Sequence, residues 1–244
     1  MTKLVNMIIL LLIFIVIIVG IILYFYTNNE KYSTLDKPSL DLIIYINLDK
    51  RKDRRKDVEK FISKINNKNI PVYRLSATFN KRNGHLGCAD SHIRALKYAK
   101  QQKVDNVLIL EDDVSLNCTP DEFNNKIKYF FNNYHNYDAV TLFGHHKGGL
   151  IPLDKHISKF SPKDGYSTTA LGYIVNKKAY DDFLRVFSEA KQKMIEELKT
   201  YEGRSLTSLY AIDIMWGELQ KKKKFYIFEP HIVKPSGSSS EIMK

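Results

Sequence analysis

The chain has 244 residues, of which 44% are hydrophobic and 27% charged, so it is long and apolar enough to form one medium-sized domain with a hydrophobic core. The formal charge is +11, but most basic residues are dispersed, and the two basic runs at 50–56 and 221–224 lack interleaved aromatic residues. We therefore expect no nucleic-acid partner, although a membrane-tethered nucleic-acid binder is the alternative that the charge leaves open. Two cysteines, Cys88 and Cys118, are too few for a disulfide scaffold and wrongly spaced for a zinc site, so they form one disulfide bond or two structural free thiols.

An apolar segment at residues 7–26 follows a short tail, 1–6. It carries no charge and no polar face, and at ~1.5 Å per residue it would span roughly 30 Å, the thickness of a bilayer core. It exceeds the about 7–15 residues of a secretory h-region, and no small-residue cleavage site follows it. We interpret it as a transmembrane signal-anchor, followed by a polar stalk at 27–40 and a folded domain at 41–244, with a buried helix of a soluble protein as the alternative. The flanking lysines do not decide the orientation.

The folded domain shows an alternation of apolar strands and amphipathic helices. Strands are predicted at 41–47, 72–77, 106–110, 139–143 and 170–175, and helices at 54–64, 89–101, 121–132 and 177–198. Strands that are apolar on both faces predict an α/β fold with a mostly parallel, doubly wound sheet, whose ligands bind at the carboxyl ends of the strands. Residues 144–167 are rich in glycine and proline, which predicts a loop that forms a mobile flap.

The most informative motif is the acidic triplet Glu111, Asp112 and Asp113, which ends a buried apolar strand. If the triplet stays extended, Glu111 and Asp113 point to the same face of the sheet. Two carboxylates there suit Mg²⁺ or Mn²⁺ held together with a diphosphate. A solvated acidic turn is the alternative.

Two further segments carry polar residues beside predicted elements. In residues 84–92, Gly87 allows a close backbone approach, and Ser91 and His92 would donate hydrogen bonds near a helix N-terminus, although a simple helix cap is the alternative. In residues 44–54, a strand passes into a basic turn where Arg51 and Arg54 would reach a phosphate or a uridine; a solvated helix start is the alternative.

The order of these motifs resembles glycosyltransferase family 25, the lipooligosaccharide and procollagen galactosyltransferase-like group. The resemblance covers roughly residues 42–240 and rests on 46–54, on Gly87-Cys88 with Ser91-His92, and on the acidic triplet, and it continues through 168–175 and 211–213. Lys50 stands where the family more often has arginine, so this position keeps its charge but loses a guanidinium that can donate two parallel hydrogen bonds. Residues 239–242 match the family only loosely.

The resemblance implies a GT-A-like Rossmann-type fold, a UDP-sugar donor and inversion at the anomeric carbon. It further implies galactose as the sugar, a glycan or a hydroxylysine of a collagen-like protein as the acceptor, and a type II membrane protein whose catalytic domain lies in the lumen of the endoplasmic reticulum or Golgi. By this resemblance, we expect Glu111 and Asp113 to bind the metal ion. We expect the donor to be bound by Asn47, Leu48, Arg51, Arg54, Gly87, Ser91, His92 and Asp112.

Two late residues are candidates for further roles. Asp213 lies in an apolar stretch and matches the family's late aspartate, so we expect it to be the general base, with a helix N-cap as the alternative. His231 is either an additional metal ligand or a surface histidine. A catalytically silent member of the same fold, serving as a binding or adhesion ectodomain, is the competing function.

Overall fold

The structure is a computed structural model that describes residues 13–24, 39–200 and 208–237. Contacts divide the chain into two compact units, Met1–Ser39 and Leu40–Lys244. Residues 13–24 of the first unit are helical and expose apolar side chains, including Phe14 and Val16. Within the described ranges, no helix is both long and apolar enough to cross a membrane, and residues 7–12 and 25–26 of the predicted span lie outside these ranges.

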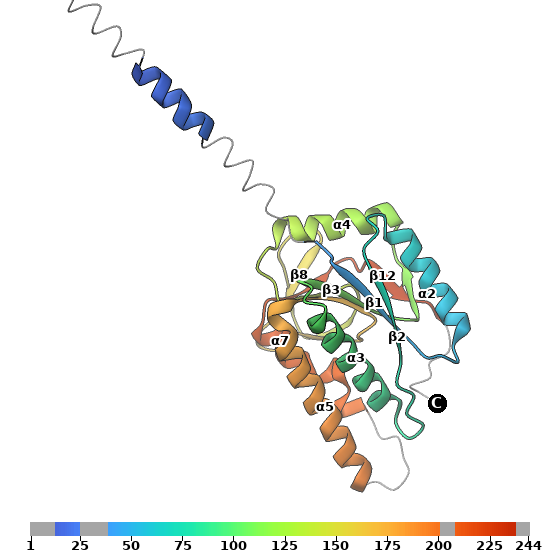
Figure 1. Ribbon diagram of the computed structural model, residues 1–244. Coiled ribbons are helices and arrows are strands. Elements are labelled where there is room, and N and C mark those ends of the chain that lie inside the picture. Colours follow the sequence, from blue (N-terminus) through green and yellow to red (C-terminus); the bar gives the residue numbers. More distant parts are fainter. Residues whose placement is uncertain (1–12, 25–38, 201–207, 238–244) are drawn as a thin grey trace, which may run out of the picture. The chain divides into compact units, whose positions relative to one another are not determined.

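The second unit is built on one eight-stranded sheet (Figure 1). Its strands follow the order β2 (Val72–Ser76), β1 (Leu42–Asn47), β3 (Asn106–Glu111), β10 (Gly172–Asn176), β5 (Ala139–Thr141), β11 (Phe225–Phe228), β8 (Ile157–Phe160) and β7 (Leu150–Pro152). Only two strands of this sheet, β10 and β8, run antiparallel to the rest. The other six run in one direction: β2, β1, β3, β5, β11 and β7. The predicted α/β class with a mostly parallel sheet is confirmed.

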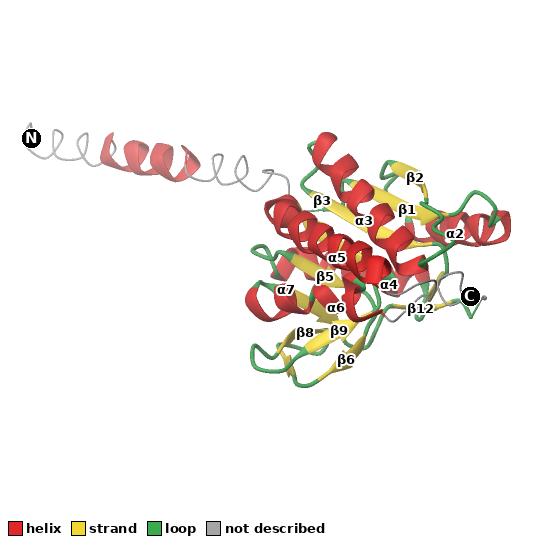
Figure 2. Cartoon of the chain, turned by 90° about the horizontal axis from the view of Figure 1, so that it is seen from below, coloured by secondary structure: helices red, strands yellow, loops and turns green. Residues whose placement is uncertain are grey.

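Helices cover both faces of this sheet (Figure 2). One face packs against α3 (Gly84–Gln101), α5 (Tyr180–Thr200), α6 (Ile212–Met215) and α7 (Gly217–Lys222), and the other against α2 (Lys52–Ile65) and α4 (Pro120–Asn133). Side chains of β1 alternate between the two cores, with Ile44 in the first and Ile43 and Tyr45 in the second. This two-faced burial is why the strands are apolar throughout.

The segment predicted as a loop at 144–167 consists largely of short strands. β7 and β8 extend the main sheet, while β6 (His145–Lys147) pairs with β9 (Tyr166–Thr168). The loop prediction is wrong because Ile157 and Phe160 are buried core residues, and Gly148, at φ 71°, allows the turn between β6 and β7. A third small sheet joins β4 (Val114–Leu116) to β12 (Val233–Pro235).

Helix α3 begins five residues earlier than predicted, at Gly84 rather than at 89. The side chain of Asn83 caps it by accepting a hydrogen bond from the amide of Leu86. Gly87 therefore lies within the helix and not before it, and Ser91 and His92, which were expected near the N-terminus, lie in the middle of the helix.

Candidate active site

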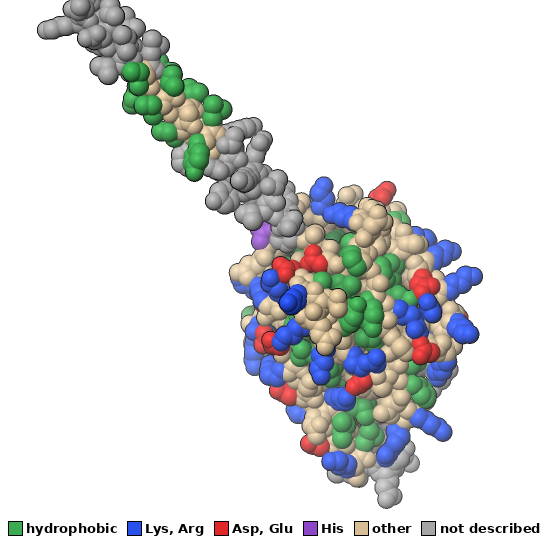
Figure 3. Space-filling model, viewed as in Figure 1, with side chains coloured by type: hydrophobic (Ala, Val, Ile, Leu, Met, Phe, Trp, Pro, Cys, Tyr) green, Lys and Arg blue, Asp and Glu red, His purple; other side chains and the backbone are tan. Residues whose placement is uncertain are grey.

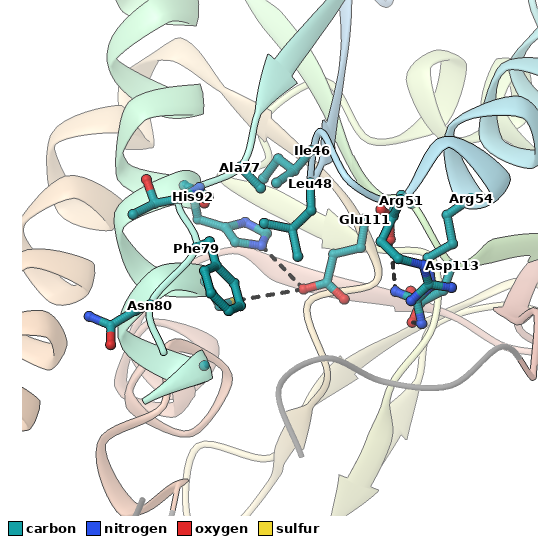
Figure 4. Close-up of a pocket in the computed structure, with 15 residues that line it drawn as sticks. Ile46, Leu48, Arg51, Arg54, Ala77, Phe79, Asn80, His92, Glu111 and Asp113 are labelled. Carbon is teal, nitrogen blue, oxygen red and sulfur yellow. Dashed lines mark hydrogen bonds and ion pairs between the residues drawn. The ribbon is translucent and has the colours of Figure 1, made fainter. Parts of the chain in front are cut away.

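A cleft lies beyond the carboxyl ends of β1, β2 and β3, where the parallel strands predicted a ligand site (Figure 4). It encloses about 690 Å³ of space, part of which is open solvent. Its lining consists of Ile46, Leu48, Arg51, Arg54, Ala77, Thr78, Phe79, Asn80, Gly84, Cys88, Ser91, His92, Glu111, Asp112 and Asp113. Eight of the eleven predicted site residues are in this lining, and Asn47, Gly87 and Asp213 are not.

The acidic triplet is not extended as predicted. Strand β3 ends at Glu111, and Asp112 and Asp113 form a turn before β4. Arg54 explains this geometry, because its Nη1 lies 2.8 Å from Asp112 Oδ1 and its Nη2 lies 3.2 Å from Asp113 Oδ2. One guanidinium thus holds two neighbouring carboxylates on the same side of the cleft.

Asp112 and Asn47 form the buried support of the triplet. Asn47 Nδ2 donates to Asp112 Oδ2 at 2.7 Å and to the carbonyl of Arg51, while its Oδ1 accepts from Arg74. The amide of Asn47 is therefore engaged within the chain, and its role is to position the carboxylate of Asp112. Arg51 also contacts a neighbour, since its guanidinium makes a two-point ion pair with Asp53.

The carboxylate of Asp113 is only partly hydrogen-bonded. Its Oδ1 is buried and accepts no hydrogen bond from any residue in the described ranges. Burial, followed by the negative charge of Glu111, raises the pKa of Asp113 to about 6 despite the nearby Arg54. The cleft holds three carboxylates, two of which form ion pairs with Arg54, so the donor set fits a divalent cation.

Glu111 is oriented by residues of α3. His92 Nε2 lies 3.3 Å from Glu111 Oε1, and Cys88 Sγ donates to the same oxygen at 3.7 Å. His92 is itself fixed because its Nδ1 lies 2.8 Å from the hydroxyl of Tyr173. Figure 4 shows Glu111 between His92 on one side and the pair of Arg54 and Asp113 on the other. Burial alone would raise the pKa of Glu111, but its contacts with His92 and Cys88 lower it below the ordinary value.

Ser91 and Gly87 shape the wall of the cleft rather than offering it free donors. The hydroxyl of Ser91 donates to the carbonyl of Gly87 at 2.7 Å and accepts from the amide of Thr78 at 2.9 Å. A Cβ on Gly87 would lie 2.4 Å from the carbonyl oxygen of Thr78, so only glycine lets α3 approach the 77–80 loop this closely.

The loop at 77–80, which follows the carboxyl end of β2, is not among the predicted site residues. Its Phe79 lines the cleft with 57% of its surface exposed, and Lys50 Nζ lies 4.2 Å above its ring. The available signal was its position, because parallel strands place their carboxyl ends at one edge of the sheet.

Asp213 lies at the second residue of α6, whose N-cap is Ala211, so the N-cap alternative is wrong. Its Oδ2 accepts a hydrogen bond of 2.7 Å from the amide of Thr169, a residue with a φ of 84°. Burial raises the pKa of Asp213, and the charge of Glu111 raises it further. Asp213 is outside the cleft lining, but it lies close enough to Glu111 for their charges to interact.

The two cysteines are free and half-buried, so the disulfide alternative is wrong. Burial raises the pKa of the Cys88 thiol well above its ordinary value, so this thiol is protonated at neutral pH.

His231 groups with Glu229 and His146, whereas Glu111 groups with Cys88 and His92. Burial, together with the neighbouring His146 and His145, keeps the pKa of His231 low despite the charge of Glu229.

One known protein family matches most of the folded unit. The family described as glycosyltransferase family 25 (LPS biosynthesis protein) matches residues 41–200, which are 160 of the 244 residues. A search of curated proteins finds no significant match.

Three solved structures show the range of similarity. A glycosyltransferase involved in glycosylation of the major capsid of PBCV-1 is 16% identical, with 83% of this chain and 95% of that one covered and a TM-score of 0.44. The mannose-1-phosphate geranyltransferase from Thermus thermophilus is 10% identical, with coverage of 78% and 74% and a TM-score of 0.47. The glycosyltransferase GlyE of Streptococcus pneumoniae is 10% identical, with coverage of 79% and 46% and a TM-score of 0.42.

The family match covers the first strand, the segment containing Gly87 and His92, and the acidic triplet, and these are the parts that form the cleft. Membership implies a nucleotide-sugar donor and a glycan acceptor. The chain belongs to glycosyltransferase family 25 and is a glycosyltransferase.

Proposed function

We propose that the enzyme transfers galactose from UDP-galactose, with inversion and with Mn²⁺ or Mg²⁺, to a hydroxyl of a glycan or of hydroxylysine in a collagen-like protein. The observation that carries the metal requirement is Asp113 Oδ1, a buried acceptor without a donor among the described residues, in a cleft with two further carboxylates. Glu111 and Asp113 would hold the ion. When bound, a divalent cation there would neutralise the charge that develops on the leaving diphosphate.

The other residues of the site position the carboxylates or take part in proton transfer. Arg54 and Asn47 hold Asp112 and the turn in place, and His92 orients Glu111. In the transfer, the acceptor oxygen forms a bond to the anomeric carbon as the bond from that carbon to UDP breaks, and a carboxylate takes the proton of the hydroxyl. We assign this base to Asp213, whose raised pKa favours proton acceptance nearer neutral pH than an ordinary aspartate would.

A donor panel tests this proposal. The full chain is incubated with UDP-galactose, UDP-glucose and UDP-N-acetylglucosamine, with a glycan or a hydroxylysine peptide as acceptor, and release of UDP is measured with Mn²⁺ and with a chelator. We expect acceptor-dependent release from UDP-galactose that the chelator removes, and a product of inverted anomeric configuration. Turnover that persists in the chelator would contradict the metal assignment, and a preference for another UDP-sugar would contradict galactose.

We also propose that residues 7–26 anchor the enzyme as a single-pass type II membrane protein with its catalytic domain in the lumen of the endoplasmic reticulum or Golgi. The exposed apolar side chains of the described helix at 13–24, seen along its visible face in Figure 3, support this proposal. The same figure shows basic residues dispersed over the visible face of the second unit rather than gathered into one patch. Carbonate extraction should leave the full chain in the membrane fraction, and protease should digest the catalytic domain only after the vesicles are opened.

A further inference from the structure

A second cluster of ligand-type side chains lies outside the cleft. His146 is on β6, while Glu229 and His231 follow β11, and one ligand atom from each lies within 4.8 Å of the others. Because β5 and β11 run in the same direction as β3, both segments lie beyond the same edge of the sheet as the acidic triplet. Residues 83 positions apart in the chain are therefore brought together by the fold.

Two of the three side chains in this cluster have a ligand atom that lacks a well-oriented hydrogen bond. Glu229 Oε1 and His231 Nε2 lie 2.9 Å apart, yet both are buried and neither forms a well-oriented hydrogen bond with a residue in the described parts of the chain. Phe143 packs edge-on against His231 at 4.9 Å and against His145 at 5.1 Å, which gives the cluster an apolar wall. Buried polar atoms without partners are costly, and a bound ion is one way to satisfy them.

We propose that His146, Glu229 and His231 bind a transition-metal ion of the zinc class, separate from the ion assigned to the acidic triplet. Two imidazoles and one carboxylate are a known ligand set for Zn²⁺, with a fourth position left for water or another ligand. Imidazole nitrogens favour such borderline ions, whereas the all-oxygen set of Glu111 and Asp113 favours Mg²⁺ or Mn²⁺. The exposed position of His146 gives the ion a route from solvent.

The ion would join β6 to the segment that follows β11. β6 pairs with β9, and β9 is followed by Thr169, whose amide donates to Asp213. A metal between β6 and the segment after β11 would therefore stabilise the region that holds Asp213. This inference does not depend on the identity of the donor or of the acceptor.

Zinc binding by the full chain tests the proposal. After removal of metal with a chelator, Zn²⁺ is titrated in competition with a chromophoric chelator, and Co²⁺ is substituted to record visible absorption. We expect one Zn²⁺ per chain in the absence of nucleotide, a rise in the unfolding temperature with Zn²⁺, and absorption bands of low-symmetry Co²⁺.

Substitutions locate the site. His146→Ala, Glu229→Gln and His231→Ala should each weaken Zn²⁺ binding by about 100-fold or more, since even loss of outer-shell support costs about 10–100-fold. His146→Ala removes an exposed side chain, and Glu229→Gln keeps the shape of the side chain. We therefore expect these two variants to fold, so that weaker binding in them reports on the site. His135→Ala is the matched control, because His135 is exposed and precedes β5 at the opposite edge of the sheet.

The proposal is overturned if the three variants bind Zn²⁺ as wild type does, if wild type binds it more weakly than about 1 mM, or if Asp113→Asn alone removes binding. The last outcome would assign the zinc to the acidic triplet.

Discussion

The carboxyl edge of the sheet carries two clusters that differ in chemistry and in origin. The first, at the end of β3, is formed by three consecutive carboxylates, two of which, Asp112 and Asp113, form ion pairs with Arg54. The second, beyond β5 and β11, combines two imidazoles and one carboxylate from distant parts of the chain. The first lines the cleft and the second does not.

This difference indicates a division of labour. The parallel strands β1, β2 and β3 end at the cleft in which we propose that the donor binds, whereas the strands added around β5 and β11 support the region that holds Asp213. Oxygen donors suit an ion shared with a diphosphate, and nitrogen donors suit an ion that stays with the protein. Changes in the first cluster should therefore affect chemistry much more than changes in the second.

The largest effect is expected for Asp113→Ala. It removes the carboxylate whose Oδ1 lacks a donor among the described residues, so transfer should fall by about 10³-fold or more. Affinity for UDP should fall only when Mn²⁺ is present, as measured by calorimetry with and without the ion. His231→Ala is the comparison variant, and it should keep transfer within about threefold because it leaves all carboxylates of the cleft in place. Equal UDP affinity with and without metal in wild type would remove the ion from the first cluster.

Asp213→Asn separates a base from a structural acceptor. The amide oxygen of asparagine can still accept the hydrogen bond from Thr169, so the fold should persist, but it cannot take a proton. We expect turnover to fall by about 10²-fold or more, with UDP and Mn²⁺ binding unchanged. Near-normal turnover in a folded Asn variant would show that Asp213 only positions Thr169.

A third effect concerns stability and pH without metal. The pKa of Asp113 is about 6 in the fold and ordinary, at 3.8, when unfolded, so its contribution to stability is complete below pH 3.8 and is lost as pH rises through 6. The Asp113→Asn variant does not lose this stability as pH rises, because asparagine does not titrate. At pH 7.5 with a chelator, it should raise the free energy of unfolding by about 1–3 kcal/mol, measured by urea unfolding, and the gain should shrink toward pH 4.5. A gain of the same size at both pH values would contradict the titration of Asp113.

Phe79 tests whether the aromatic at the cleft mouth contacts the nucleobase. Stacking on an aromatic ring contributes about 1–3 kcal/mol per base, so Phe79→Ala should raise the KM for the donor by about tenfold with little change in kcat. Phe79→Tyr should restore the wild-type value because it keeps the ring. An unchanged KM in the alanine variant would place the base elsewhere in the cleft.

The parallel core was predictable because its signal is local. Residues of β1 and β3 are buried on both faces, which makes them continuously apolar, and the buried face of α2 repeats at Val58, Phe61 and Ile65. The 144–167 segment was not predictable in the same way. Its strands are only three or four residues long, too short for a period of two to emerge from its many turn residues.

Within the site, residue types were predictable but partners were not. The basic and acidic character of Arg54 and Asp112 is visible in the sequence, but only the fold brings them within 2.8 Å and makes Arg54 a counter-ion as well as a cleft residue. Likewise, Gly84 and His85 do not resemble the start of a helix, so the cap at Asn83 was missed and His92, expected near the N-terminus, lies in the middle of α3. Long-range pairing is not encoded in local spacing.

Substitution of Cys88 should give the smallest effect, although its thiol contacts Glu111 of the first cluster. Its Sγ is 3.7 Å from Glu111, and burial keeps the thiol protonated, so it acts as a weak hydrogen-bond donor rather than as a nucleophile or a thiolate ligand. His92 makes the shorter contact to the same oxygen and should hold Glu111 when Sγ is removed. We expect Cys88→Ala to lower turnover by less than about threefold and to leave the Mn²⁺ requirement unchanged, as measured by UDP release. If a folded Cys88→Ala variant lost all turnover, Cys88, His92 and Glu111 would have to act together as a ligand set, and the division between an oxygen site in the cleft and a nitrogen site outside it would no longer hold.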